Sequence, residues 1–256
     1  MKTESRKPLV IDCHAYAGSG KTWADPARDV NYEAAEIFER GTAAGIDRHC
    51  VMPPRNDTYR EANRQIASLC EQHAGRLIGF AAHSPRREAG SLRRMLVEEV
   101  RSMGLRAVRS DGPPNRELLD AVVELGIPVI YYPSGNWQQL GRYIHMPATA
   151  YPKVNFIIPH LGQYHSLSWA AHPEAIDLAR RYGNVYLDMS GVGSFKYAEM
   201  AVRELPPDKI LFGTCAPELD PRVDREALRL LKLPPAAFAK VASQNLLRLL
   251  GKPPRV

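Results

Sequence analysis

The sequence predicts a single α/β domain with the architecture of a TIM (β/α)8 barrel. Short apolar, β-branched runs alternate along the chain with stretches of helical spacing. About eight such pairs fit into the 256 residues, which is the usual size of this barrel. No linker-like or low-complexity stretch divides the chain, so we expect one domain over residues 1–256.

The elements follow from local patterns. Strands are expected at residues 9–15, 49–53, 77–83, 105–110, 128–133, 155–160, 185–190 and 210–215. Helices are expected, among others, at residues 31–45, 60–75, 89–104, 115–126 and 172–183. Most of these end in Gly just before the next strand, where a left-handed cap is needed. Residues 234–251 predict a closing helix.

Composition describes an ordinary soluble chain, with 45% hydrophobic and 24% charged residues. No apolar run approaches the roughly 18 to 20 residues that span a bilayer, and the N-terminal segment lacks a secretion signal. We therefore expect a cytoplasmic protein without membrane association. Cys13, Cys50, Cys70 and Cys215 are widely spaced and form no CxxC pair, so we expect reduced thiols.

The net charge of +6 raises a nucleic-acid hypothesis, but the arginines are interleaved with Glu on predicted helix surfaces. Solvated helix faces explain them, and we expect no nucleic-acid partner. A basic enzyme instead attracts anionic small molecules, so the expected partner is a small-molecule substrate.

Residues 15–22, "AYAGSGKT", look like a phosphate-binding loop, which would make the protein a nucleotide hydrolase. That loop needs GxxxxGK[ST], but its first position is Ala15. The helix that should follow would contain Pro26 within its first turns. Asp188 ends an apolar strand and could imitate the Walker B carboxylate of nucleotide hydrolases, although apolar strands that end in Asp are common in α/β proteins. We interpret residues 18–20 as a flexible loop after the first strand.

In a TIM barrel the chemistry lies at the carboxyl ends of the strands. Polar residues at the predicted strand ends are His14, Tyr16, His83, Ser110, Asp111, Tyr132, His160, Asp188, Cys215 and Glu218. Histidines, acids and phenols from different strands would therefore converge on one mouth.

Motifs in a fixed order resemble the amidohydrolase-related ("amidohydrolase 2") branch of the amidohydrolase superfamily. "VIDCHAYAG" resembles the opening IDxHxH strand, "AAGIDRHCVMPP" the step into strand two, and "RLIGFAAHSP" strand three. "MGLRAVRSDG", "VNFIIPHLGQYH", "VYLDMSG" and "DKILFGTCAPELDP" are similar to strands four, six, seven and eight. "VASQNLLRLLG" looks like the family's closing helix, so the resemblance covers nearly the whole chain.

The resemblance implies a metal site whose ligand positions are partly replaced. The HxH pair maps to His14 and Tyr16, and the strand-five histidine maps to Tyr132. The strand-six histidine is kept as His160, while the strand-eight aspartate maps to Cys215. Three of the five positions have therefore changed.

Catalytic zinc normally has three protein ligands and a water. His14 and His160 alone would bind zinc weakly, and the Cys215 thiolate would complete a His2Cys set. Cys215 would then replace the strand-eight aspartate, which in the family orients or deprotonates the nucleophilic water. Either one divalent metal, with zinc favoured, or none is consistent with this pattern.

A metal-independent reaction is the alternative, since some relatives in this branch open lactones without metal. Tyr16 and Tyr132 would donate hydrogen bonds to an oxyanion or act as general acids. His14, His83 and His160 are the candidate acid and base groups, with Asp111 and Asp188 as carboxylates. The candidate substrate-binding residues are Arg109, Asp111 and His83, with Arg109 pairing with an anion.

Each candidate also has a purely structural interpretation. His14 and His160 would then be hydrogen-bonded core residues, and Tyr16 and Tyr132 would fill a vacated metal pocket. Cys215 is expected to be a small buried residue rather than a nucleophile. Asp111 and Asp188 would cap turns. A loop or surface position is expected for His83, His145, His165 and His172.

The leading hypothesis is a hydrolase that acts on a small anionic carboxylate or lactone, with His14, Tyr16, Tyr132, His160 and Cys215 as its catalytic set. A decarboxylase is a less favoured alternative. A catalytically silent barrel that binds a ligand or partner is the alternative from another class. Barrels of this kind often pair, so a homodimer is allowed but not required. Substrate identity lies in loop shapes that one sequence does not reveal.

Overall fold

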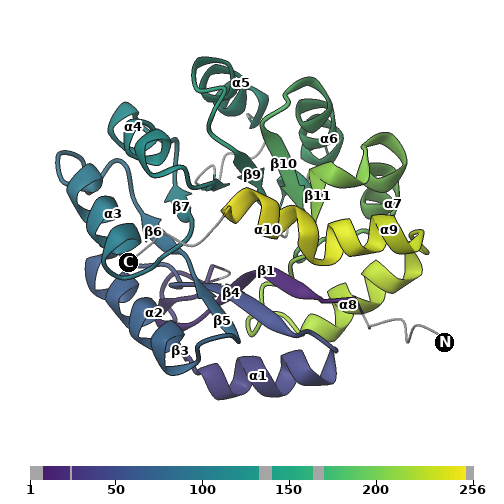
Figure 1. The fold of residues 1–256 in the computed structure, drawn as a ribbon, viewed down its shortest axis with the longest axis horizontal. Helices are drawn as coiled ribbons and strands as arrows, with labels where there is room; N and C mark the ends of the chain where they lie inside the picture. Colours follow the sequence, from purple (N-terminus) through teal and green to yellow (C-terminus); the bar gives the residue numbers. More distant parts are fainter. Residues whose placement is uncertain (1–7, 24, 133–139, 164–169, 252–256) are drawn as a thin grey trace, which may run out of the picture.

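The structure, a computed structural model, describes residues 8–23, 25–132, 140–163 and 170–251. Figure 1 shows a ring of strands surrounded by helices, as the sequence predicts. The barrel strands are β1 (Ile11–Tyr16), β4 (Arg48–Met52), β5 (Leu77–Gly79), β6 (Ala81–His83), β7 (Val108–Asp111), β8 (Val129–Tyr132), β9 (Phe156–Ile158), β10 (Val185–Asp188) and β11 (Ile210–Leu211). All of their pairings are parallel.

The strands are joined by helices that lie outside the ring (Figure 1). These are α1 (Ala34–Ala43), α2 (Arg60–Gln72), α3 (Leu92–Arg101), α4 (Arg116–Leu125), α5 (Leu140–Ala150), α6 (Ala171–Arg181), α7 (Phe195–Glu204) and α8 (Pro221–Leu230). The predicted closing helix consists of α9 (Pro235–Ala239), the π-helical turn η4 (Lys240–Gln244) and α10 (Asn245–Leu250). Among the described residues, no helix is long and apolar enough to cross a membrane.

The ring closes at two seams between its sheets. At the first, the single strand predicted at 77–83 is interrupted at Phe80, because β5 pairs with β4 whereas β6 pairs with β7. The Phe80 N–H donates to the Val51 carbonyl, and the Ala81 N–H to the Ala107 carbonyl, both at 2.9 Å. The prediction of one uninterrupted strand was therefore wrong. The chain passes at Phe80 from pairing with β4 to pairing with β7.

The second seam joins the first strand to the last. The Cys13 N–H donates to the Phe212 carbonyl at 2.9 Å, and the Cys215 N–H donates to the His14 carbonyl at 2.7 Å. Strand β11 itself ends at Leu211, earlier than the predicted 210–215, but the segment after it continues along β1. Cys215 is thereby held next to the carboxyl end of β1.

Other strand ends also come earlier than predicted. Strand β9 stops at Ile158 instead of residue 160, because Pro159 begins a short 3-10 turn, η2 (Pro159–Gly162). Strand β10 ends at Asp188, two residues before the predicted end. Residues 159 and 160 therefore leave the strand direction at the rim of the barrel.

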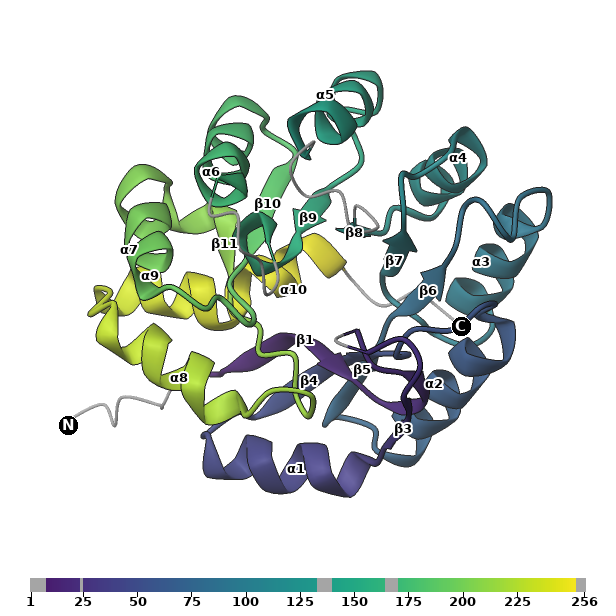
Figure 2. The ribbon, with the colours of Figure 1, turned by 180° about the vertical axis from the view of Figure 1, so that it is seen from behind.

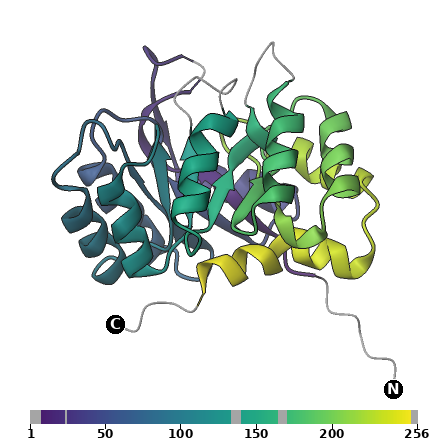
Figure 3. The same ribbon diagram turned by 90° about the horizontal axis from the view of Figure 1, so that it is seen from above.

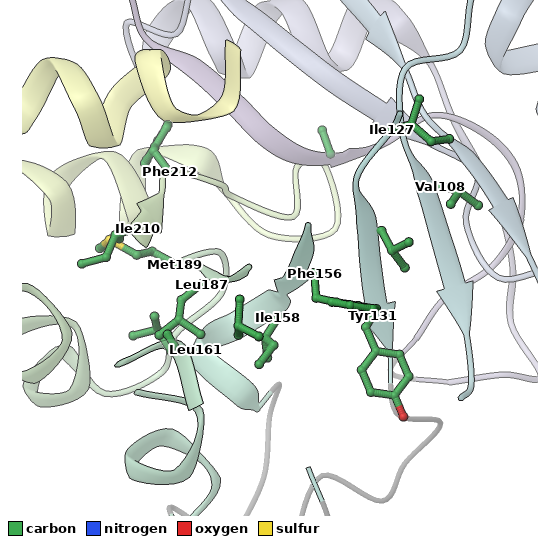
Figure 4. Packing of buried hydrophobic residues seen from close by; sticks show 14 of the residues in the cluster. Val108, Ile127, Tyr131, Phe156, Ile158, Leu161, Leu187, Met189, Ile210 and Phe212 are labelled. Atoms are coloured by element: carbon green, nitrogen blue, oxygen red, sulfur yellow. The ribbon is translucent and has the colours of Figure 1, made fainter. Parts of the chain in front are cut away.

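Alternate strand residues divide the core into two layers. The outer layer packs strand residues such as Val108, Phe156 and Leu187 against the helices, and Figure 4 shows part of it. The inner layer contains residues such as Ile130 and Ile157 together with α10 leucines. Because both faces are buried, nearly continuous apolar strands are stable here.

Helix α10 covers the end of the barrel formed by the amino ends of the strands. Leu246, Leu249 and Leu250 pack against the inner layer. The Arg106 guanidinium donates to the carbonyls of Leu250 and Gly251, both at 2.9 Å. Figure 3 shows α10 along one end of the barrel. The opposite end, formed by the carboxyl ends of the strands, is called the mouth below.

A hairpin rises at the mouth, where the sequence analysis expected a flexible loop. Strand β2 (Gly18–Lys21) pairs antiparallel with β3 (Asp29–Tyr32), and Figure 2, which looks onto this end, shows β3 beside α2. The loop interpretation was wrong because Lys21 and Arg55 exchange two backbone hydrogen bonds of 2.9 and 3.2 Å. A Cβ at Gly20 would lie 2.7 Å from the Arg55 carbonyl, so this close approach explains a glycine of "AGSGKT".

Candidate active site

Four polar side chains from three strand ends meet beneath the mouth. His14 and Tyr16 come from β1, Tyr132 ends β8, and His160 follows β9. All four are buried. The convergence of these residues, which the sequence predicted from their strand-end positions, is present in the structure.

The Tyr132 hydroxyl is the centre of this cluster. It lies 2.9 Å from His14 Nε2, 2.8 Å from His160 Nε2 and 2.7 Å from the Tyr16 hydroxyl. The Tyr16 hydroxyl is also 3.0 Å from His14 Nε2. We call these four residues the mouth cluster.

A bulge in β1 presents His14 to the cluster. Asp12 pairs with His49 and Ala15 with Val51, so β1 contains one extra residue between these pairs. The Asp12 carboxylate accepts the His14 N–H at 2.9 Å, which holds the bulge. Residues two apart in a strand share a face, which places His14 and Tyr16 together, and the extra residue allows Cys13 to belong to the inner layer as well.

Asp188 fixes the orientation of His14. Its Oδ2 lies 2.6 Å from His14 Nδ1, and its Oδ1 accepts the Ser190 N–H at 2.6 Å. Burial alone would raise the pKa of Asp188, but the His14 imidazole and the Ser190 contact bring this pKa below its ordinary value. The ionised carboxylate accepts the proton on His14 Nδ1, which leaves Nε2 facing the phenols.

His160 is oriented in the same way from the other side. Its Nδ1 donates to the Ser190 carbonyl at 2.8 Å, so its Nε2 faces Tyr132. The Cys215 sulfur lies 3.7 Å from His160 Nδ1. Both His160 (φ 59°) and Cys215 (φ 61°) have left-handed backbones, which are strained for residues with a Cβ. Such strain is concentrated at functional sites, and it marks both residues here.

The phenols and the thiol are protonated groups. Burial raises the pKa of Tyr16 and of Tyr132 well above the ordinary value for a phenol. Burial and the nearby Asp188 carboxylate raise the pKa of the Cys215 thiol in the same way. Tyr16 and Tyr132 are therefore hydrogen-bond donors. Cys215 has the character of a small buried residue, as the sequence analysis expected, rather than that of a thiolate nucleophile.

Arg109 is part of the wall of the site. Its guanidinium is fully buried and donates to Asp111 Oδ1 at 2.8 Å, to the Pro53 carbonyl at 2.6 Å and to the Tyr59 hydroxyl at 3.1 Å. Asp111 also accepts from the Tyr59 hydroxyl. Arg109 and Asp111 thus have partners in each other and in the loop after β4, and their role in substrate binding stays a prediction.

His83 was also predicted to bind substrate, and the structure places it elsewhere. It follows the outward alternation of Ala81, is fully buried, and lies 3.1 Å from Glu88 Oε2 and 2.8 Å from Glu99 Oε2 through its two ring nitrogens. Both nitrogens are occupied on the helix side of the barrel. The alternative prediction of a loop or surface position is wrong, because His83 is fully buried in β6.

Three further histidines were predicted to lie on loops or on the surface. His172 is buried in α6 and donates to the Leu161 carbonyl at 2.9 Å, contrary to the surface prediction. His145 is exposed on α5, where that prediction is confirmed. His165 lies outside the described residues.

Trp23, which the sequence analysis did not single out, covers the mouth cluster. Its ring stacks on Tyr132, with centroids 4.8 Å apart and an interplanar angle of 20°. The Arg109 guanidinium carbon lies 5.1 Å from the Trp23 ring. The backbone N–H of Trp23 donates to Glu218 Oε1 at 3.2 Å. A large aromatic residue soon after the first strand was the available signal.

The residues of the mouth cluster do not fit a divalent ion as they are arranged. Ligand atoms of His14, His160 and Cys215 lie within 4.8 Å of one another. A neutral imidazole nitrogen has one acceptor position. The two phenols have one proton for each of these positions, with Tyr132 facing His160 Nε2 at 2.8 Å and Tyr16 facing His14 Nε2 at 3.0 Å. The phenols are protonated and are therefore poor ligands. The cluster is a closed hydrogen-bond network.

Comparison with a family model decides the relationship: the amidohydrolase model Amidohydro_2 matches residues 11–252. The chain belongs to this amidohydrolase family. No curated protein matches the chain.

Three similar structures illustrate the fold. The 5-carboxyvanillate decarboxylase of Sphingomonas paucimobilis has a TM-score of 0.75 at 14% identity, over 95% of this chain and 99% of that chain. The dihydroxybenzoic acid decarboxylase of Polaromonas sp. JS666, with bound manganese and 2-nitroresorcinol, has a TM-score of 0.73 at 16% identity, over 95% and 97%. A probable 2-pyrone-4,6-dicarboxylic acid hydrolase of Acinetobacter baumannii, with citric acid bound, has a TM-score of 0.72 at 16% identity, over 95% and 99%. At these identities they confirm the barrel fold.

Proposed function

We propose that this amidohydrolase-family protein is a metal-independent hydrolase of a small anionic lactone or related carboxylate. One observation carries the proposal: the Asp188 carboxylate, the His14 imidazole and the phenols of Tyr16 and Tyr132 form one continuous chain of contacts of 2.6 to 3.0 Å. A carboxylate that orients an imidazole, beside hydroxyl donors, is an arrangement suited to acyl transfer to water.

In the proposed reaction His14 is the general base. Its Nε2 takes a proton from water while the water oxygen bonds to the substrate carbonyl carbon. The carbonyl oxygen becomes an oxyanion that accepts hydrogen bonds from the Tyr16 or Tyr132 hydroxyl. When the ring C–O bond breaks, the leaving oxygen takes the proton from His14, so one water is consumed and a hydroxy acid is formed. Asp188 stays ionised and stabilises the imidazolium.

Two observations support an anionic substrate. The protein carries a net charge of +6, which favours encounter with anions. One structural relative is described as a probable hydrolase of 2-pyrone-4,6-dicarboxylic acid, an anionic lactone. We further propose that the protein is cytoplasmic, works with small molecules alone and keeps its cysteines reduced. In the described residues all four cysteines are free.

The test is turnover of a panel of lactones, amides and dihydroxybenzoic acids by the full chain with excess chelator. We expect hydrolysis of an anionic lactone that survives the chelator. His14→Ala should abolish it, and Asp188→Asn should lower kcat by about 10³- to 10⁴-fold. Thr42→Ala, at an exposed position of α1, is the matched control and should be fully active. Unchanged turnover in His14→Ala, or loss of turnover on metal removal, would disprove the mechanism.

A decarboxylase is the second enzymatic candidate, since two of the structural relatives above bear that name. It is less favoured here, because one of these relatives is described with bound manganese, whereas the mouth cluster of this chain does not fit an ion. Release of CO2 from a dihydroxybenzoic acid, without lactone hydrolysis, would replace the hydrolase proposal.

A catalytically silent barrel is the candidate from another class. It is favoured by the complete burial of the mouth cluster, whose polar tips bind one another. Stoichiometric binding of a panel compound by calorimetry, with no product formed, would support this candidate.

A further inference from the structure

We infer that the hydroxyls of Tyr16 and Tyr132 stand where a divalent ion would be held, so that exchanging the two phenols for imidazoles converts the mouth cluster into a metal centre. The inference rests on the metal-independent part of the proposed function. Tyr16 and Tyr132 are the two residues that exclude the ion, and His14 and His160 would bind it once they are replaced.

The hydroxyl oxygens of Tyr132 and Tyr16 lie at the centre of the mouth cluster. The Tyr132 oxygen is 2.9 and 2.8 Å from the Nε2 atoms of His14 and His160, so it lies between the two imidazoles. The Tyr16 oxygen is 2.7 Å from the Tyr132 oxygen and 3.0 Å from His14 Nε2. Four side chains from three strand ends therefore direct their polar tips to one small volume.

A tyrosine side chain reaches farther than a histidine side chain. An imidazole Nε2 lies about 2 Å nearer to its Cβ than a phenol oxygen does, and this difference equals a Zn–N bond of about 2.0–2.1 Å. A phenol thus reaches about as far as an imidazole together with the ion bound to it. Replacing Tyr132 by His would free the space between His14 and His160, and it would supply a nitrogen directed at that space.

The groups that orient metal-bound histidines are already present. Ligating imidazoles usually donate their other N–H to a carboxylate or a carbonyl. His14 Nδ1 contacts Asp188 at 2.6 Å, and His160 Nδ1 donates to the Ser190 carbonyl at 2.8 Å. Both Nε2 atoms are consequently held toward the centre.

The experiment measures metal content, which does not depend on turnover. Wild type and Tyr16→His/Tyr132→His are produced in medium with zinc and manganese, desalted, and analysed by inductively coupled plasma mass spectrometry. We expect close to zero ions per chain in wild type and about one in the double variant. Adding His160→Ala to the double variant should remove the ion. Tyr16→His/Tyr151→His adds as many imidazoles but keeps the Tyr132 hydroxyl, and it should stay metal-free.

Cobalt titration gives a second readout on the same proteins. Tetrahedral Co2+ absorbs in the visible range, so the double variant should develop this absorption at one equivalent and wild type should not. A folded double variant without metal, checked by circular dichroism, would overturn the inference. Wild type that takes up one ion would overturn it as well, whether or not the variant folds.

The outcomes separate this inference from the proposed function. If wild type hydrolyses no lactone but the double variant gains one ion, the inference stands and the hydrolase proposal falls. If wild type hydrolyses an anionic lactone but the folded double variant binds no ion, the hydrolase proposal stands and the inference falls.

Discussion

His83 carries a buried positive charge between the barrel and α3. Its ring nitrogens contact Glu88 and Glu99, and the Asn63 side chain donates to Glu99 at 2.9 Å. Burial alone would lower the pKa of His83, but the two glutamates outweigh burial and raise it to about 9. The imidazolium therefore belongs to the folded state at neutral pH.

This charge predicts a pH dependence of stability. The folded pKa of about 9 lies above the ordinary 6.5, so the stabilisation is complete below pH 6.5 and is lost as the pH rises through 9. We expect the free energy of unfolding, measured by urea denaturation, to fall by on the order of 3 kcal/mol across this range. His83→Gln should be less stable at pH 6.5 and show a flatter profile. An equally steep profile in the variant would show that another group titrates.

The sequence did not reveal the partners of His83 and Arg109, and the reasons are physical. Residues 77–83 are apolar on both faces, so no alternation told which way His83 points. Arg109 was assigned to substrate because its partners, the loop carbonyls of Pro53 and Pro54, are invisible to residue-type reasoning. His14 and His160 converge as expected, because carboxyl ends of neighbouring parallel strands must meet at the mouth.

At the scale of elements, α1 is coupled to the β1 bulge through a glycine. A Cβ on Gly41 would lie 2.2 Å from His49 Nε2. His49 Nδ1 in turn contacts Asp12 at 3.2 Å, and Asp12 holds the bulge that presents His14. The glycine is therefore required by the close approach of the helix to the strand.

Gly41→Ala should accordingly reverse the usual effect of this substitution. In a helix, Gly to Ala normally gains up to about 1 kcal/mol. Here we expect a loss of roughly 1 to 3 kcal/mol from overpacking against His49. Thr42→Ala, next to it and exposed, is the control and should be neutral or slightly stabilising. A gain in urea stability for Gly41→Ala would show that His49 moves without cost.

The β2–β3 hairpin carries Trp23 onto Tyr132, and this arrangement predicts a movement on ligand binding. Because the mouth cluster is buried beneath this stack, substrate must displace the indole. In a Trp137→Phe/Trp169→Phe chain, Trp23 is the remaining tryptophan. Saturation with a hydrolysed lactone should shift its emission to longer wavelength as the ring enters water. Unshifted emission under saturating turnover would show that substrate enters by another route.

The elements themselves were predictable where local pattern decides them. The strand and helix order followed from apolar runs and Gly caps, and α4 does end at Gly126 with φ 66°. The hairpin was missed because β2 has the sequence GSGK, which shows no apolar alternation, although it pairs with β3 over four residues. Pairing of this kind leaves little local signature in a glycine-rich strand.

At the scale of the whole molecule, the two ends of the barrel have different tasks. The mouth holds buried polar groups and strained backbone, which cost stability, whereas α10 fills the other end with leucines. Eight βα units predicted this division, because the chemistry of such barrels lies at the carboxyl ends of the strands. The sealing of the other end by α10 was expected only as a closing helix.

Two neighbouring leucines of α10 test this division. Leu246 is 2% exposed and packs inside the barrel, whereas Leu247 is 40% exposed. Leu246→Ala should lower the free energy of unfolding by about 2 to 5 kcal/mol, because it leaves a cavity that the strand ends cannot close. Leu247→Ala should stay within about 0.5 kcal/mol of wild type. Below its melting temperature the Leu246→Ala protein should keep the wild-type KM for its lactone, because the mouth is untouched. A changed KM would show instead that packing at the closed end determines the shape of the mouth.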